Sequence, residues 1–292
     1  MAYKQSFSYM GNKYKLLSQI LPYFPRNIKN FYDIFGGSAV VSMNVKAENY
    51  FVNDLSNHLY NLYDMFKTNS AKEIIDYCYQ KRDEYGFITT SDREELKRNK
   101  EPYNKCREDI NSNPSTLGYF FLTYYAFCNN FRFNNGKFNM PVGNGYFREE
   151  CEIEIKNLCK FFSQDNVYIS NLSYEQVIPE EDSFVYADLP YANTEAVYND
   201  KREIAAWTEE SDYAFFRYCE NLNTKGIRFA ISNVFRNKGA ENKHLIDWCE
   251  KNNWVVHHLN MKYAGHSFET ANMQTDEVLI CNYVNEDMNC LF

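Results

Sequence analysis

Three carboxylates, Asp33, Asp54 and Asp188, each follow or end a short apolar segment of the chain. Short apolar segments of this kind are typical of buried strands. Open α/β sheets bind ligands at the carboxyl ends of their parallel strands, where a carboxylate can accept hydrogen bonds from hydroxyl or amino groups. The three acids therefore predict a binding site at one edge of a sheet.

The segment Asp33-Ile34-Phe35-Gly36-Gly37-Ser38 places two glycines directly after a strand. Glycines at a strand-to-helix turn let the backbone approach a ligand closely, although this turn alone is weak evidence for a cofactor site. Asp54 ends the next strand, where an acid commonly binds ribose hydroxyls; an N-cap of the helix beginning near Leu55 is a compatible reading. Since the G-x-G-x-x-G pattern is missing, the two features together predict an adenosine-bearing ligand without a pyrophosphate.

The tetrapeptide Asp188-Leu189-Pro190-Tyr191 joins a carboxylate, a main-chain carbonyl restrained by the following proline, and an aromatic ring. Two acceptors and a ring are suited to hold an exocyclic amine and to stack on the base that carries it. Taken alone, the tetrapeptide favours a turn followed by a core tyrosine over a binding site.

Five short strands, separated mostly by helical patterns, position these residues. We expect them around residues 31–35, 50–52, 183–187, 228–231 and 277–282, with a helix after Gly37 and another after Leu55. This alternation predicts an α/β fold with a mainly parallel sheet. The polar, mostly helical segment 71–164 interrupts the pattern, and two alternating runs around Asn135-Gly136 predict a hairpin within it.

The composition is that of a folded globular protein: of 292 residues, 45% are hydrophobic and 24% charged. No apolar run is long enough to span a bilayer, and the first residues lack the apolar core of a secretory signal. Nine cysteines without a C-x-x-C pair are typical of reduced thiols. These features predict a soluble, cytoplasmic protein with no membrane partner.

The net charge of −8 would normally argue against nucleic acid as a partner, but the charge is unevenly distributed. Residues 93–148 hold nine basic and five acidic side chains, a balance of +4. A local basic surface can bind phosphates because screening confines electrostatic fields to roughly 10 Å. A solvated helical face is the plainer interpretation of the same charges.

Together, these segments resemble the Dam-like, alpha-ordered DNA adenine-N6 methyltransferases of the D12 class. The resemblance runs from about residue 7 to residue 283, and its specificity comes from the order of seven matches. The matching segments are Phe7–Lys13, Asp33–Ala39, Asn53-Asp54, Phe131–Gly143, Asp188–Tyr191, Ile231–Asn233 and Asp276–Ile280.

The resemblance implies a Rossmann-like sheet that uses S-adenosylmethionine, formed by residues 1–70 and 165–292, with a target-recognition insert at 71–164. It implies methyl transfer to N6 of a flipped-out adenine in double-stranded DNA without a metal, with GATC as the favoured site. The implied catalytic residues are Asp188, Leu189, Pro190 and Tyr191. The implied cofactor-binding residues are Tyr9, Lys13, Asp33, Phe35, Gly37, Asp54 and Asp188.

The segment around 131–143 is similar to the hairpin with which the family reads DNA. Arg132 is the main candidate for a contact to a base edge, since a guanidinium can bind guanine through two hydrogen bonds. Further candidates are Asn134, Lys137, Asn139 and Pro141. Lys97, Arg98, Lys100 and Lys105 are expected to hold phosphates without reading sequence. A cognate restriction endonuclease acting on the same site is a further expected partner.

Two residues depart from the family's pattern. Ala39 stands where the cofactor loop usually has a second glycine, and Leu189 stands where the catalytic motif usually has its first proline. Leucine keeps the main-chain carbonyl that the mechanism needs but loses rigidity, at a cost of about 1 kcal/mol. We expect activity to survive this change.

Three alternatives remain open. The first is methylation of an RNA adenine or a protein glutamine, which Asp188 and the position of the insert disfavour. The second is a catalytically weak or silent member of the family that acts as a DNA-binding regulator, which Ala39 and Leu189 keep open. The third is a dehydrogenase, which the missing G-x-G-x-x-G pattern disfavours.

Overall fold

The computed structural model describes residues 2–4, 13–189, 207–237, 239–260 and 275–285. The chain forms two compact units, which we treat separately. One unit contains residues 56–169, and the division falls within the strand 167–170, which we describe with the sheet of the other unit. The other contains residues 13–55 and 170–189 and the described residues from 207 onward.

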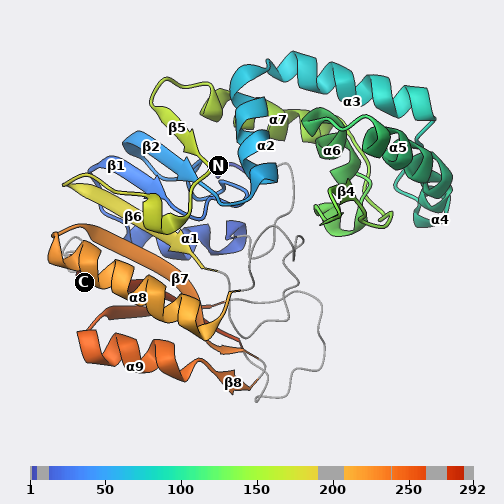
Figure 1. Cartoon of the computed structure of the whole chain (residues 1–292). Coiled ribbons are helices and arrows are strands. Elements are labelled where there is room, and N and C mark those ends of the chain that lie inside the picture. Colours follow the sequence, from blue (N-terminus) through green and yellow to red (C-terminus); the bar gives the residue numbers. More distant parts are fainter. Residues whose placement is uncertain (1, 5–12, 190–206, 238, 261–274, 286–292) are drawn as a thin grey trace. The chain divides into compact units, whose positions relative to one another are not determined.

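The second unit is built on a sheet with the strand order β5-β2-β1-β6-β7-β10-β9, with β8 paired to β7 (Figure 1). The pairs β1/β2, β1/β6 and β6/β7 are parallel, and β10 runs antiparallel to both of its neighbours. This confirms the predicted α/β fold with a mainly parallel centre. The strands are β1 (Ile28–Asp33), β2 (Ala47–Asn53), β5 (Val167–Ser170), β6 (Ser183–Asp188), β7 (Arg228–Asn237), β8 (Ala240–Glu241), β9 (Val255–Leu259) and β10 (Asp276–Cys281).

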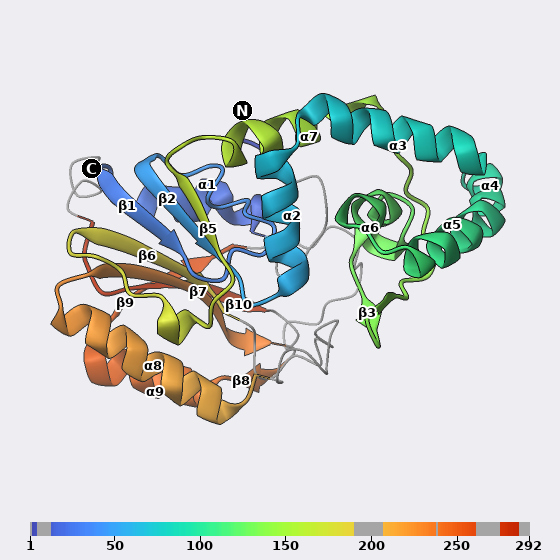
Figure 2. The same ribbon diagram turned by 45° about the horizontal axis from the view of Figure 1, so that its top comes forward.

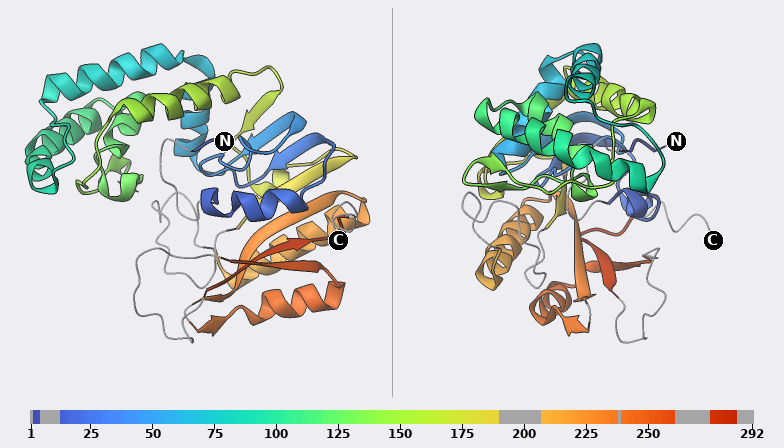
Figure 3. Two further views of the ribbon diagram at one scale, coloured as in Figure 1. Left: turned by 180° about the vertical axis from the view of Figure 1, so that it is seen from behind. Right: turned by 90° about the vertical axis from the view of Figure 1, so that its right-hand side faces the viewer.

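Helices cover both faces of this sheet. Helices α8 (Glu209–Thr224) and α9 (Lys243–Asn252) bury Phe215 and Leu245 against one face. The short helix α1 (Leu17–Ile20) covers the other face, and Figure 3 shows it from behind. Three 3₁₀ turns complete the unit: η1 (Tyr14–Leu16), η2 (Leu21–Tyr23) and η5 (Tyr174–Gln176). The result is a three-layer α/β unit with an apolar core on each side of the sheet.

The helix expected after Gly37 does not form. Residues 38–45 instead make a series of turns, with hydrogen bonds from Ala39 N to Gly36 O (2.7 Å) and from Met43 N to Ala39 O (2.9 Å). Ala39 is buried and has φ 55°, a left-handed conformation that is unfavourable for a residue with a Cβ and breaks a right-handed helix. The alanine therefore adopts a conformation that the family's glycine would adopt without strain.

The first unit is mainly helical (Figure 2). Helix α2 buries Leu59, Leu62 and Phe66, as its sequence pattern predicts. Aromatic rings dominate the core: Phe66 lies 5.2 Å from Phe120, and Tyr63 stacks on Phe162 at 5.1 Å. The helices are α2 (Asn57–Thr68), α3 (Ala71–Tyr85), α4 (Arg93–Leu96), η3 (Lys97–Asn99), α5 (Lys100–Ser112), α6 (Thr116–Thr123), η4 (Phe127–Asn129) and α7 (Glu149–Phe162).

The predicted hairpin is confirmed by strands β3 (Phe133–Asn134) and β4 (Lys137–Phe138), which pair antiparallel. Its two turn residues, Asn135 and Gly136, have φ values of 52° and 70°. Positive φ at both central residues is typical of the type I′ turn that Asn-Gly favours, because its twist matches that of the flanking strands.

The boundaries of the helical unit, after residues 55 and 169, lie outside the segment 71–164 that the sequence assigned to the insert. The difference is α2, which packs on α6 and α7 within this unit. No helix in the described parts of the chain is long and apolar enough to cross a membrane.

Candidate active site

The parallel register brings the three predicted acids to one edge of the sheet. Strands β1 and β6 end at Asp33 and Asp188, and Asp54 follows the end of β2. Their charges influence one another: the carboxylates of Asp188 and Asp54 both raise the pKa of Asp33. The predicted convergence of the strand ends is thus realised in the fold.

A partly buried ion pair lies at this edge. Lys13 Nζ is 2.6 Å from Asp188 Oδ1, and the two side chains are 3% and 22% exposed. Lys13 directly precedes η1, at the start of this unit's sequence and far along the chain from Asp188. The sequence nominated both residues for the site but gave no sign that they pair.

Burial and pairing act in opposite directions on these two groups. Burial disfavours the Lys13 ammonium, but the nearby Asp188, Tyr186 and Glu277 outweigh it and raise the pKa of Lys13 to about 12. Burial raises the pKa of Asp188, and the Lys13 ammonium opposes that rise. Lys13 therefore favours an ionised carboxylate at the end of β6.

Asp33 carries a fully buried carboxyl group at the same edge. Its Oδ2 accepts a 2.6 Å hydrogen bond from Ser42 Oγ, while Oδ1 is buried and accepts no hydrogen bond from the described residues. Burial, with help from the neighbouring acids, raises the pKa of Asp33 to about 7. A buried acceptor without a donor is costly, so this oxygen is suited to receive a hydrogen bond from a bound molecule.

The glycine loop is held by the end of β2. Gly36 N donates to Asn53 O (2.7 Å), and Gly37 N donates to Asp54 Oδ2 (3.0 Å). Gly37 has φ 53°, which a glycine adopts without a steric penalty. The proposed N-cap role of Asp54 is wrong, because Ser56 occupies the N-cap of α2 and the Asp54 carboxylate bonds the loop instead.

Asn53 is a positioning residue that the sequence analysis quoted without giving it a role. Its side chain is buried and makes four hydrogen bonds: Nδ2 donates to the carbonyls of Ile34 (3.1 Å) and Leu172 (3.0 Å), and Oδ1 accepts from Ser170 Oγ (2.8 Å) and Leu172 N (3.0 Å). It therefore ties the ends of β1, β2 and β5 together beneath the loop. A polar residue at the end of a buried strand was the available signal.

Leu189, which replaces the family's usual proline, has its side chain in the apolar core rather than at the site. It is 3% exposed and belongs to the cluster that includes Ile34, Phe215 and Ile231. An anchored side chain restricts the backbone next to it. Burial of the leucine thus compensates for the rigidity that the missing proline ring would supply.

We expect Leu189→Ala to lower the free energy of unfolding by about 2–4 kcal/mol, because it leaves a cavity in this cluster. Urea denaturation followed by circular dichroism measures the change. Ile178→Ala is a suitable control, since that side chain is 76% exposed and should change stability little. Equal stabilities of Leu189→Ala and the wild type would contradict the anchoring role.

Tyr9, Pro190 and Tyr191, which the resemblance places at the site, lie outside the described residues. Phe35 is described and partly buried; its ring lies 5.6 Å from that of Tyr174 and 5.8 Å from that of Trp207. The described part of the chain contains no group of three or more His, Cys, Asp or Glu residues that could hold a metal ion.

In the helical unit, the side chain of Arg132 is bound to Asn139 across the hairpin. Arg132 Nε donates to Asn139 Oδ1 (2.8 Å), and Nη2 donates to Asn139 O (2.7 Å). The hairpin is in turn held by α5, whose Asn111 exchanges two hydrogen bonds with the backbone of Phe138 (2.8 and 2.9 Å). Arg132 and Asn139, two of the five DNA-binding candidates, are thus bonded to each other. Two others, Asn134 and Lys137, face each other across the hairpin. The carbonyl of the fifth, Pro141, accepts a hydrogen bond from Phe127 N (2.8 Å).

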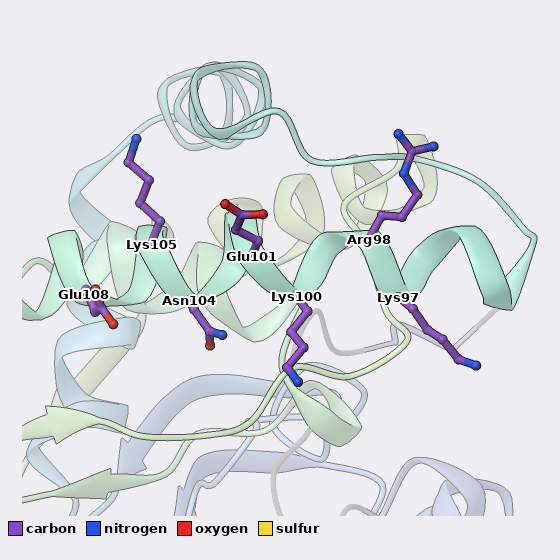
Figure 4. A pocket seen from close by; sticks show the side chains of 7 residues that line it. All are labelled: Lys97, Arg98, Lys100, Glu101, Asn104, Lys105 and Glu108. Carbon is purple, nitrogen blue, oxygen red and sulfur yellow. The ribbon is translucent and has the colours of Figure 1, made fainter.

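The four predicted phosphate-binding residues surround a shallow hollow of about 540 Å³ on η3 and α5 (Figure 4). All four are exposed. Figure 4 shows Arg98 and Lys105 on one side of the ribbon and Lys97 and Lys100 on the other. Lys97 also pairs with Glu94 at 2.7 Å. These residues form a mixed, solvated surface that does not converge on one point.

The segments that form the strand ends, the loop and the hairpin match a known protein family in sequence. The family model described as "D12 class N6 adenine-specific DNA methyltransferase" matches residues 9–263. The chain belongs to this family. The D12 match spans both units, from the site at the sheet edge to the hairpin, and it confirms the resemblance that the ordered motifs indicated.

Two relatives match nearly the whole chain. The modification methylase StsI of Streptococcus sanguinis is 35% identical over 99% of this chain and 44% of its own length. The type II methyltransferase M.FokI of Planomicrobium okeanokoites is 32% identical over 97% of this chain and 43% of its own length. A DNA adenine methylase of Salmonella typhimurium is 24% identical over 65% of each chain. The chain thus spans less than half the length of the first two relatives.

Proposed function

We propose that this chain transfers a methyl group from S-adenosylmethionine to N6 of adenine in double-stranded DNA. The observation that carries the proposal is the partly buried Lys13–Asp188 pair at the same sheet edge as the Asp33 and Asp54 carboxylates and the Gly37 loop. The match to the D12 family supports this assignment of substrate and reaction.

The site residues fit the chemical groups of S-adenosylmethionine. Asp54 and the buried Oδ1 of Asp33 are acceptors for ribose hydroxyls and an amino group. Lys13 supplies a cation for the methionine carboxylate, and Phe35 supplies an apolar surface for the purine. When bound, the cofactor supplies an electrophilic methyl group on a sulfonium centre.

The residues at the end of β6 make the adenine amine reactive. The N6 lone pair is delocalised into the ring, so the amine is a poor nucleophile. The Asp188 carboxylate accepts one N–H of the amine and the Leu189 carbonyl accepts the other, which localises the lone pair and stabilises the positive charge that develops on nitrogen. Asp188, whose pKa is raised by burial, is also positioned to take the proton that the amine loses.

A base inside a duplex cannot reach two acceptors at the end of a buried strand, so the target adenine must leave the stack. Tyr191 is proposed to stack on the flipped base. The hairpin around Arg132 reads the sequence, with GATC as the proposed site. The names of the StsI and M.FokI relatives support a modification enzyme with a cognate restriction endonuclease that acts on the same site. A cytoplasmic location belongs to the same proposal, because a DNA-modifying enzyme must reach the DNA of the cell.

The recognition role of the hairpin makes a separate prediction. Arg132→Ala should reduce discrimination at one base pair of the site by about tenfold or more, the loss expected when a two-bond base contact is removed. Asn111→Ala is the matched control: it also weakens the hairpin, but through its attachment to α5, and should reduce DNA binding similarly for all sequences. Methylation rates on oligonucleotides with single base-pair changes distinguish Arg132→Ala from Asn111→Ala. If the two variants show the same relative rates over these oligonucleotides, Arg132 only holds Asn139 and does not read a base.

A catalytically silent DNA-binding protein is the second candidate, and the replacement of proline by Leu189 is the feature that favours it. Long-read sequencing of DNA from cells that lack adenine methylation but express this chain tests both. A methylated adenine in one recurring sequence supports the enzyme and reveals its site. Unmodified DNA, with DNA binding retained in vitro, would support the silent protein.

A further inference from the structure

A tryptophan precedes helix α8 in a local arrangement that fixes its ring. The helix begins with a capping box, in which Thr208 Oγ1 accepts from Ser211 N (3.3 Å) and Ser211 Oγ accepts from Thr208 N (3.2 Å). The residues on either side of such a box usually make an apolar contact. Here they make a hydrogen bond instead, from Trp207 Nε1 to Asp212 Oδ1 (2.6 Å).

The acceptor of this bond is itself held in place. Asp212 is 2% exposed, and its second oxygen, Oδ2, lies 2.6 Å from His244 Nε2 on α9. Beside a carboxylate, Nε2 is best assigned as the protonated nitrogen that donates. Both carboxylate oxygens are therefore bonded, and the orientation of the indole is fixed by two helices rather than by packing alone.

The indole ring contacts the aromatic residue next to the glycine loop. The Trp207 and Phe35 rings meet edge to face, with centroids 5.8 Å apart at 78°. Tyr174 and Phe215 lie behind them, with ring centroids 6.0 and 6.3 Å from that of Trp207. The rear pair is buried, whereas Phe35 and Trp207 are only partly buried. The arrangement is a two-ring apolar surface, backed by the core, beside the loop that Asp54 holds.

We propose that Trp207 is a positioning residue for the cofactor: held by Asp212 and His244, it fixes the Phe35 ring against which the purine of S-adenosylmethionine packs. This inference rests on the proposed function. Neither Trp207 nor its two partners is part of the Asp188 centre, so the role is expected to affect cofactor affinity and leave the chemical step unchanged.

The test is equilibrium binding of S-adenosylhomocysteine, measured by isothermal titration calorimetry on the full chain. Trp207→Phe removes the N–H and shortens the ring, and should weaken binding about three- to tenfold, the range expected for one edge-to-face contact. In methylation assays the same variant should raise KM for S-adenosylmethionine and leave kcat unchanged.

Trp248→Phe is the matched control. Trp248 also donates from Nε1 to a carboxylate, Glu220 Oε1 on α8 (3.0 Å), but its ring stacks on Phe216 (4.3 Å) in the core between α8 and α9. It should lower the melting temperature about as much as Trp207→Phe and leave the binding constant unchanged. If Trp207→Phe does not fold, Asp212→Asn, which keeps the indole and removes the charge that orients it, should weaken binding in the same direction.

Three outcomes would overturn the inference. If a folded Trp207→Phe binds S-adenosylhomocysteine as tightly as the wild type, the inference is wrong while the proposed function stands. The same follows if Trp248→Phe loses as much affinity as Trp207→Phe, because the loss would then reflect a general effect of stability. A wild-type chain that binds no S-adenosylhomocysteine would overturn the cofactor assignment of the proposed function and this inference together.

Discussion

Asp188→Ala is expected to abolish methyl transfer and to leave DNA binding intact. The substitution removes the carboxylate that accepts an N–H of the target amine, and loss of a single preorganised group of this kind lowers turnover by about a hundredfold or more. Methyl incorporation from labelled S-adenosylmethionine measures the rate, and fluorescence anisotropy with a labelled duplex measures binding. Asp188→Asn, which keeps an acceptor oxygen but loses the charge, should retain more activity than the alanine variant.

Asp276→Ala provides the matched control for the loss of an aspartate. Asp276 lies at the start of β10 and pairs with the exposed His258 at 2.8 Å, so its removal should leave turnover unchanged. Asp188→Ala also leaves the Lys13 ammonium buried without its partner, which should lower stability by about 3–5 kcal/mol. Wild-type turnover in Asp188→Ala would remove Asp188 from the mechanism.

Lys13→Met is expected to shift the pH dependence of methyl transfer upward. Burial raises the pKa of Asp188, and Lys13 opposes that rise. Without Lys13 the pKa of Asp188 rises further, so the carboxylate is protonated over more of the acidic range and activity is lost there. Methyl-transfer rates measured between about pH 5 and pH 9 should show that the loss of activity on the acidic side begins at a higher pH in Lys13→Met than in the wild type. The activity of the variant should be closest to that of the wild type at the alkaline end of this range.

The same pair predicts how stability depends on pH. The pKa of Lys13 is raised from an ordinary value of 10.5 to about 12 in the folded chain. Its contribution to stability is therefore fully present below 10.5 and is lost as the pH rises through 12. Lys15→Met is the control, because Lys15 is exposed two residues away. The measurement is the free energy of unfolding of each variant as a function of pH. If this free energy depends on pH in the same way for Lys13→Met as for Lys15→Met, the coupling between Lys13 and Asp188 is contradicted.

The sequence was sufficient to predict the features that depend on local patterns. Short apolar strands ending in acids predicted the sheet edge of Asp33, Asp54 and Asp188, because parallel strands share the direction of their carboxyl ends. The dipeptide Asn135-Gly136 predicted the hairpin, because a type I′ turn needs positive φ at both positions. Each of these predictions used a pattern within a short stretch of chain, either the end of one strand or the dipeptide of a turn.

The remaining features depend on contacts between distant segments. Nothing local to Lys13 or Asp188 indicated that they pair, and the role of Asn53 depends on carbonyls from two other segments. The residues after Gly37 form turns rather than a helix because Ala39 adopts a left-handed conformation imposed by the loop. Likewise, the pattern of the hairpin gave no sign that Arg132 binds Asn139.

Identification of the methylated base is the most direct test of the central claim that the site at the end of β6 methylates an adenine amine. The purified chain is incubated with S-adenosylmethionine that carries a deuterated methyl group and with unmethylated genomic DNA, and the DNA is digested to nucleosides for mass spectrometry. We predict deuterium-labelled N6-methyladenine, and none with Asp188→Ala. Label found only on cytosine, or no labelled nucleoside from a chain that binds both DNA and S-adenosylhomocysteine, would contradict the account.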